Sequence, residues 1–155
     1  MKTLTLLDIR DYFDGIRTAL DLVPNFVFSS DEQGLRETIA LFGDSYMFVD
    51  YGDLTSSLEQ QELLLRDSFE MAVTLAHPFG VNSVTNETIM QKNSELFSKM
   101  NQLRGRMYKD QRCIPWLKYL SFPNSVSPFT APDISRSIGF SLIFRTEGYD
   151  LFGVR

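Results

Sequence analysis

The sequence contains only one cysteine and one histidine in 155 residues, and this scarcity excludes several kinds of site. Cys113 alone cannot form a disulfide within the chain or an all-cysteine metal site, and His77 alone cannot give zinc three histidine ligands. Cys113 stands just before a predicted strand, so we interpret it as a small, half-buried residue. We interpret His77, which precedes a proline, as a strand-end histidine bonded to the backbone. No metal or cofactor site is predicted.

Long apolar runs are also missing, and no stretch approaches the roughly 20 apolar residues of a membrane span. The first apolar run breaks at Asp8, too early for the apolar region of a signal peptide. We therefore expect a soluble protein made in a reducing cytoplasm. The glycine patterns GxxxxGK[ST] and GxGxxG, which cradle nucleotide phosphates, are absent. With a net charge of −5, the chain as a whole has no attraction for nucleic acid or for an anionic membrane.

What is present is typical of a globular protein. The length fits one domain, residues 1–155, which can bury about 70% of the surface of its unfolded chain and needs no covalent staple. Apolar residues make up 43% and charged residues 23%, so disorder is not expected. Phenylalanine is unusually frequent, with 13 residues, and a sheet is a natural place for so many aromatic side chains.

Two amphipathic helices are predicted. Thr5 and Asp8 resemble a capping box before the first helix, and Pro24 ends that helix. Asn86 can cap the second, and Glu87 suits its first turn. The apolar stripes are Leu6, Ile9, Phe13, Ile16, Leu20 and Val23 in the first helix, and Ile89, Leu96, Phe97, Met100, Leu103 and Met107 in the second.

The clearest strand covers residues 62–77, where apolar and polar residues alternate. Asp67 interrupts its apolar face, and the run is longer than usual, so a bulge or bend is expected near this residue. Asp67 is either a buried acid with a shifted pKa or a bulge residue turned to solvent, and we favour the bulge.

Other segments give weaker signals. Apolar segments around 36–42 and 46–51 flank Gly43 and Asp44, which indicates a hairpin or a bulge. Residues 116–122 and the alternating residues 134–144 are predicted strands. Residues 29–34 and 55–62 are predicted loops. The proline-rich connector 123–132 is expected to be extended without regular pairing.

This order of elements favours an α+β fold over an alternating α/β fold. One-sided strands fit a mainly antiparallel sheet of about four to five strands, with two helices packed on one face and the other face open. The open face would carry the small residues of the last strand, which are Ser135, Ser137, Gly139 and Ser141.

The sharpest catalytic signal is the segment IALFGDS, residues 39–45, which resembles the nucleophile block of the GDS(L)-type esterases. The resemblance implies Ser45 as nucleophile and a base from a C-terminal Asp-x-x-His, because a serine needs a base to become nucleophilic. Here the only histidine is His77, and Thr74 stands where the aspartate should be. A small serine hydrolase or ligand-binding domain that uses Gly43, Asp44 and Ser45 is therefore an alternative, and no residue is assigned a catalytic role.

Carboxylates are plentiful, but their spacing does not match an EF-hand. They are Asp44, Asp50, Asp53, Glu59, Glu62, Asp67 and Glu70. Trp116 and Tyr119 could stack on bases, but the acidic balance favours packing in the core or at an interface. Phe129 on its loop and the tail aromatics Tyr149 and Phe152, with Leu151, either hold a neighbouring subunit or fold back on their own core.

A first helix, a strand hairpin, a long strand, a long second helix and a closing pair of strands resemble the tail terminator and head–tail joining (neck) proteins of long-tailed bacteriophages. The resemblance implies a non-enzymatic virion protein that forms a homo-oligomeric ring, commonly a hexamer, and contacts tail tube or neck proteins. One sheet surface and the loops would make the ring, and the acidic side would face the channel. The connector 123–132 has no evident place in such a ring. A monomeric adaptor domain is a further alternative.

Overall fold

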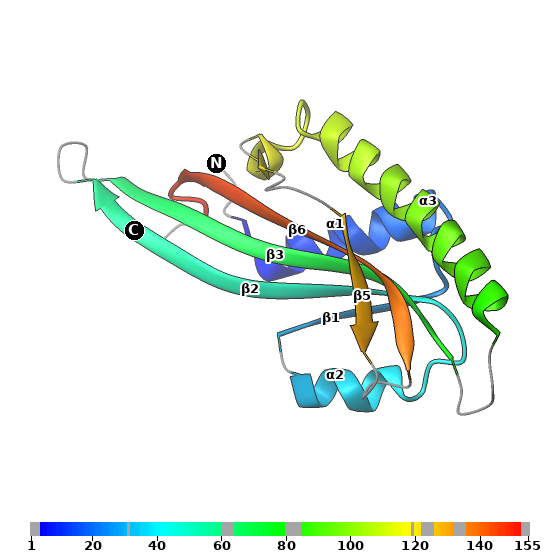
Figure 1. Ribbon diagram of the computed structural model, residues 1–155. Coiled ribbons are helices and arrows are strands. Elements are labelled where there is room, and N and C mark those ends of the chain that lie inside the picture. The colour runs from blue at the N-terminus through cyan, green and yellow to red at the C-terminus, as the bar shows by residue number, and fades with distance from the viewer. Residues whose placement is uncertain are drawn as a thin grey trace.

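The structure is a computed structural model that describes residues 4–30, 32–59, 64–79, 85–118, 120–121, 126–131 and 136–152 (Figure 1). The helices in this part of the chain are α1 (Leu6–Ala19), α2 (Glu32–Ile39) and α3 (Asn86–Asp110), and a short 3-10 helix spans Pro115–Leu117. The strands are β1 (Asn25–Ser29), β2 (Tyr46–Glu59), β3 (Leu64–Pro78), β4 (Leu120–Ser121), β5 (Val126–Ala131) and β6 (Ser137–Tyr149).

These six strands form one mixed sheet in the order β1-β2-β3-β6-β4, with β5 also paired to β6. Only the β1–β2 pair is parallel. The α+β class and the mainly antiparallel sheet are thus confirmed, but the strand count of four to five is wrong. One unexpected strand is β5, which lies in the connector that we expected to be unpaired. Its Pro128 is tolerated because β5 pairs with β6 alone in the described part of the chain, so it sits at an edge.

The main core lies between the sheet and helices α1 and α3. Most residues of the two predicted apolar stripes face this core, but Leu6 and Phe97 are 40% and 46% exposed. The capping box of Thr5 and Asp8 is present at the start of α1, whereas Thr85, one residue before the expected Asn86, caps α3. Tyr12 of α1 donates a hydrogen bond to Asp110 of α3 over 3.1 Å and joins the two helices. The helix residues buried in this core are Ile9, Phe13, Ile16, Leu96, Met100, Leu103 and Met107.

The other face of the sheet, which was predicted to be open, is covered at one end by α2. Leu35 and Ile39 of this helix pack against Tyr46 and Ala76 in a second, smaller core, and Figure 1 shows α2 on the opposite side of the strands from α3. The prediction failed because α2 has only eight residues, and eight residues give too short a stretch for helical periodicity to stand out.

The small residues of β6 are therefore not a free surface at this end. Ser137 is fully buried, Gly139 is buried, and the Ser141 hydroxyl shares a 2.6 Å hydrogen bond with Thr74. Ser135 lies outside the described residues. The face opens only further along, where Ile143 is 46% exposed.

Four shorter predictions need correction. Ser29 of the predicted loop 29–34 ends β1, and residues 32–34 belong to α2. Residues 36–42 belong mostly to α2 instead of a hairpin strand, and Trp116 lies in a 3-10 turn, so among the described residues of the predicted strand 116–122 only Leu120–Ser121 is strand. Most of the predicted loop 55–62 is strand, because β2 continues to Glu59. Residues 55–59 are polar except for Leu58, and a segment of this composition lacks the apolar pattern of a buried strand.

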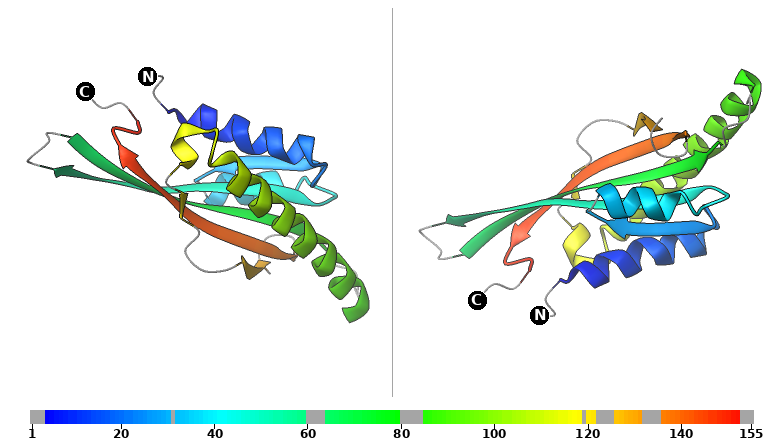
Figure 2. Two further views of the ribbon diagram at one scale, coloured as in Figure 1. Left: turned by 90° about the horizontal axis from the view of Figure 1, so that it is seen from above. Right: turned by 90° about the horizontal axis from the view of Figure 1, so that it is seen from below.

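The β2–β3 hairpin continues past the end of β1 as an arm, which we define as residues 50–70 without the undescribed 60–63 (Figure 1). Strand β6 stays paired with β3 as far as Arg66, so only the tip of the arm extends beyond the other described strands. Strand β1 pairs with β2 only as far as Asp50. A bulge at the base of the arm shifts the register between Tyr51 and Leu54, and such a bulge increases the local twist of the strand. Figure 2 shows the arm leaving the body of the protein on the side away from α3.

Alanine substitutions at two glycines are expected to change the free energy of unfolding in opposite directions. A Cβ at Gly139 would lie 1.9 Å from the backbone oxygen of Leu75, whereas a Cβ at Gly15 would meet nothing within 4 Å. We expect Gly139→Ala to lower the free energy of unfolding by about 1–3 kcal/mol because the strands must separate. Gly15→Ala, in the middle of α1, should raise it by about 0.5–1 kcal/mol. Urea denaturation of both variants measures this, and an unchanged stability for Gly139→Ala would contradict the close strand contact.

Candidate functional site

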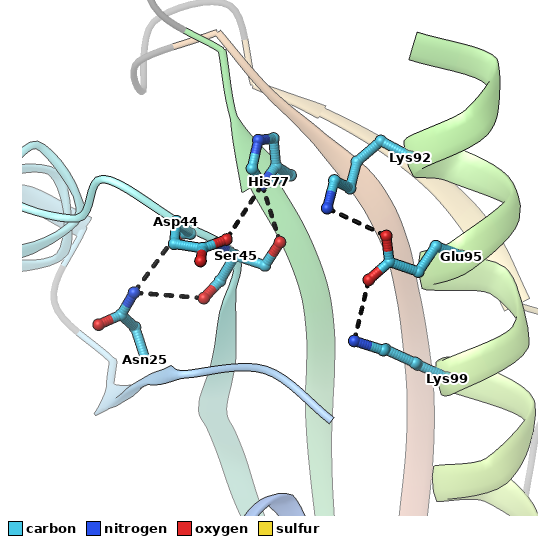
Figure 3. A network of polar contacts seen from close by, with 7 residues as sticks. All are labelled: Asn25, Asp44, Ser45, His77, Lys92, Glu95 and Lys99. Atoms are coloured by element: carbon cyan, nitrogen blue, oxygen red, sulfur yellow. Dashed lines mark hydrogen bonds and ion pairs between the residues drawn. The ribbon is translucent and has the colours of Figure 1, made fainter. Parts of the chain in front are cut away.

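The polar side chains that converge most clearly belong to Asp44, Ser45 and His77 (Figure 3). Tyr46 at the start of β2 pairs with Ala76 near the end of β3. In an antiparallel pair the residues one step outward also oppose each other, so the register brings Ser45 next to His77. The Ser45 Oγ lies 2.8 Å from His77 Nδ1, and Asp44 Oδ1 lies 3.7 Å from the same nitrogen.

The turn that carries Asp44 and Ser45 is held by its own hydrogen bonds. The backbone N–H of Ser45 donates to Asp44 Oδ1 over 2.6 Å, and the Asn25 amide donates to the backbone oxygens of Asp44 and Ser45. Ser45 is only 4% exposed. The hydroxyl is therefore fixed in position but has little access to solvent.

The His77 imidazole is partly buried, and burial lowers its pKa below the ordinary value of 6.5. The nearby Lys92 ammonium lowers the pKa further, whereas Asp44 and Glu95 oppose the shift. Lys92 and Lys99 each bond to Glu95 over 3.0 Å, and these two hydrogen bonds hold the pKa of Glu95 below its usual range. Figure 3 shows His77 between the Asp44–Ser45 turn and this ion-pair cluster on α3.

Ser45 and His77 form a hydrogen-bonded pair, but Asp44, Ser45 and His77 do not have the arrangement of a catalytic triad. In a triad the serine and the acid bind different nitrogens of the imidazole, so that the acid orients the ring while the other nitrogen takes the serine proton. Here Ser45 and Asp44 both face Nδ1. The pair can fix the turn against β3, and His77 can accept the Ser45 proton, but Asp44 does not orient the ring from the far side.

The expectation that His77 bonds to backbone missed this contact with Ser45. The sequence does place Ser45 and His77 beside the ends of two alternating segments, at residues 46–51 and 62–77. Their proximity depends on the pairing register of those segments, which no motif encodes. Thr74, the residue in the place of the esterase aspartate, bonds instead to Ser141.

Asp67 is a buried acid, so the favoured reading of a solvent-facing bulge residue is wrong. It is 3% exposed and accepts hydrogen bonds from the Ser56 hydroxyl and from the backbone N–H of Leu151. The bulge lies in the partner strand, between Tyr51 and Leu54. Asp67 thus ties the arm to the C-terminal turn.

The same contacts decide between the two readings of the tail as far as Phe152. The Phe152 ring packs edge-on against Phe69 with centroids 5.3 Å apart and contacts the main core. The described part of the tail therefore folds back on its own chain, although Tyr149 remains 50% exposed. Phe129 is partly buried against the smaller core.

Asp50, Asp53 and Glu70 line a shallow cleft of about 130 Å³ beside Ile143, on the open part of the sheet. Burial and the neighbouring Asp53 carboxylate both raise the pKa of Asp50. Glu62 lies outside the described residues, as does the Glu59 side chain. Within the described part of the chain, no three histidine, cysteine or acidic side chains come together as a metal site would need.

The remaining candidates have structural positions. Trp116 lies in the main core with its ring edge-on to Tyr12 at 5.3 Å. Cys113 is exposed, so its expected half-burial is wrong; it follows α3 in a turn instead of preceding a strand. Tyr119 lies outside the described residues. No helix among the described residues is long and apolar enough to cross a membrane.

Comparisons with protein-family models and with curated protein sequences find no match to this chain.

The lowered pKa of His77 predicts a specific pH dependence of stability. In the unfolded chain His77 binds a proton near pH 6.5, but in the folded chain it binds this proton only at a lower pH. The contribution of His77 to the free energy of unfolding is therefore highest above pH 6.5 and decreases as the pH falls below this value. We expect the wild type to lose more free energy of unfolding than His77→Gln between about pH 8 and about pH 5, since the variant lacks this proton. Urea denaturation at several pH values tests this, and parallel curves for the two proteins would contradict it.

Proposed function

We propose that this chain is a structural virion protein of a tailed bacteriophage, a tail terminator-like subunit that forms a ring at the tail end or at the head–tail neck. Its role is to bind copies of itself and the neighbouring tail tube or neck proteins, not to catalyse a reaction. Its place would be the virion after assembly in the host cytoplasm. The proposal starts from the order of elements and gains support from the shape of the fold.

The observation that carries the proposal is the arm. Leu54 and Leu58 point to the same side of the arm as the main-core residue Phe69, because Leu54 pairs with Phe69 and Leu58 lies four residues further along. They are nevertheless 46% and 56% exposed. A strand pair with exposed apolar side chains at the edge of its own core and beyond it is the kind of surface that binds another chain.

The free edge of the arm adds to this argument. From Tyr51 to Glu59, β2 has β3 on one side and no strand on the other among the described residues. Natural edge strands of this length are usually covered, shortened, bulged or blocked by charges or proline. Residues 51–59 contain neither lysine nor proline, and their protection consists of the bulge between Tyr51 and Leu54 and the charges of Asp53 and Glu59. Assembly with a second chain would cover both the edge and the leucines.

A ring is the result expected from the purified protein. Light scattering behind size-exclusion chromatography should give a mass several times that of the 17.8 kDa chain, and negative-stain electron microscopy should show closed rings. If the chain is a monomer, the same rings should appear at the ends of tail tubes from the encoding phage. A chain that stays monomeric and leaves these tube ends bare would end the proposal.

A second candidate, a small serine hydrolase, is favoured by one observation, the 2.8 Å contact between Ser45 and His77. General-base activation of a serine begins with such a contact. Two features weigh against it: Ser45 is 4% exposed, and Asp44 faces the same nitrogen of His77 as the serine does.

The two candidates differ in their reaction with a fluorophosphonate, which labels activated serines. A structural role predicts that the folded protein is labelled no faster than Ser45→Ala, because the hydroxyl is buried. Rapid labelling that disappears in both Ser45→Ala and His77→Gln would instead support the hydrolase. Circular dichroism of the two variants checks that they are folded.

A further inference from the structure

The charges of the chain are separated between two regions. Residues 50–70, the arm and its connection, carry six acidic residues and one arginine, a net charge of −5. Residues 86–118, which hold α3 and the turn after it, carry seven basic and three acidic residues, a net charge of +4. A chain with an overall charge of −5 therefore concentrates acidic residues in one element, of which Asp67 is buried, and basic residues in another.

The basic region also exposes large apolar side chains in a regular row. Met90, Phe97, Arg104, Tyr108 and Arg112 follow each other at intervals of seven, seven, four and four residues, so they share one side of the helix and its extension. Met90 is 68% exposed, Phe97 46% and Tyr108 62%, and both arginines are exposed. We call this row the α3 strip.

The acidic region has matching features. Leu54 and Leu58 are exposed along the arm, and Asp53 is exposed at its base. Both regions thus combine apolar side chains with charge, and the charges have opposite signs. Charges of opposite sign around an apolar centre are typical of protein interfaces, where they steer the encounter and fix the register.

The two regions cannot meet within one molecule. The arm leaves one end of the sheet, and α3 runs to the other end (Figures 1 and 2). Only the arm of a different copy can reach the α3 strip. A contact between two different patches on identical chains is heterologous, and it closes into a ring when the rotation between neighbours allows it.

We propose that the acidic arm of each copy docks on the α3 strip of the next copy, with Leu54 and Leu58 against the exposed apolar side chains. Asp50, Asp53 and Glu70 line the opposite face of the arm, so its negative charge attracts Arg104 and Arg112 over a longer range instead of by direct contact. This inference rests on the proposed assembly function and names the surfaces that would carry it. The same contact would cover both the free edge of β2 and the α3 strip.

Single variants on each surface test the contact. Leu58→Asp disables the arm, and Arg104→Glu disables the α3 strip. We expect either change to raise the dissociation constant of the oligomer by about tenfold or more, as measured by analytical ultracentrifugation. Because the two regions carry opposite charges, high salt should also weaken the wild-type oligomer. Leu41→Asp and Arg10→Glu are matched controls, since Leu41 is 85% exposed and Arg10 is exposed on α1.

Mixing the two disabled proteins gives the sharpest result. The Leu58→Asp protein keeps its α3 strip and the Arg104→Glu protein keeps its arm, so the mixture has one working contact and should form a one-to-one heterodimer that does not grow. A contact between like patches would give no such pair. Native mass spectrometry distinguishes the two proteins by mass.

Each other outcome has a clear meaning. If the wild type assembles and both variants assemble equally well, the inference is wrong while the proposed function stands. A wild type that stays monomeric at low salt and high concentration also overturns the inference, and the tail-tube experiment then judges the proposed function separately. If a labelled DNA duplex binds the wild type and not Arg104→Glu, while the oligomer is unchanged, the α3 strip is a nucleic-acid surface and the inference fails.

Discussion

The antiparallel pairing of β2 with β3 is the constraint on which the rest of this structure depends. It runs from Tyr46 opposite Ala76 to Glu59 opposite Leu64. At one end its register places Ser45 beside His77, and at the other it forms the arm. Side chains alternate between the two faces of a strand, so a slip of one residue would turn the core side chains of β3 outward. Body and arm are therefore fixed by the same set of backbone hydrogen bonds.

The helices cover only part of this long strand pair. Met71, Val73 and Leu75 are buried in the main core, whereas Leu58, further along the same side of the hairpin, is half exposed. At the boundary, Asp67 binds the Ser56 hydroxyl and the backbone N–H of Leu151. A buried carboxylate is costly unless it is hydrogen-bonded, and these two donors hold the base of the arm to the C-terminal turn. This anchored base gives the arm a defined direction.

The sequence allowed prediction of the elements with strong periodicity, and it failed where structure depends on pairing. The stripes of α1 and α3 and the alternation of β3 were recognised because each is long enough to repeat its pattern. The short helix α2 and the edge strand β5 were not, since two helical turns and a strand with Pro128 carry little local signal. The contact between Ser45 and His77 could not be predicted either, because it links residues 32 positions apart through the strand register.

The position of Ser45 also bears on why a hydrogen-bonded serine and histidine need not indicate catalysis. Both residues lie at strand ends, where the backbone leaves the sheet and polar groups lose their ladder partners. The Ser45 hydroxyl gives Nδ1 of His77 a partner in a site that disfavours charge on the ring, and Asn25 satisfies the carbonyls of the same turn. Every polar contact of this cluster can thus be explained by the need to close the end of the sheet. The arm exposes the apolar side chains of Leu54 and Leu58 and a strand edge for which no contact within the described chain accounts, and this difference is the reason for proposing a binding role for the arm instead of a catalytic role for Ser45 and His77.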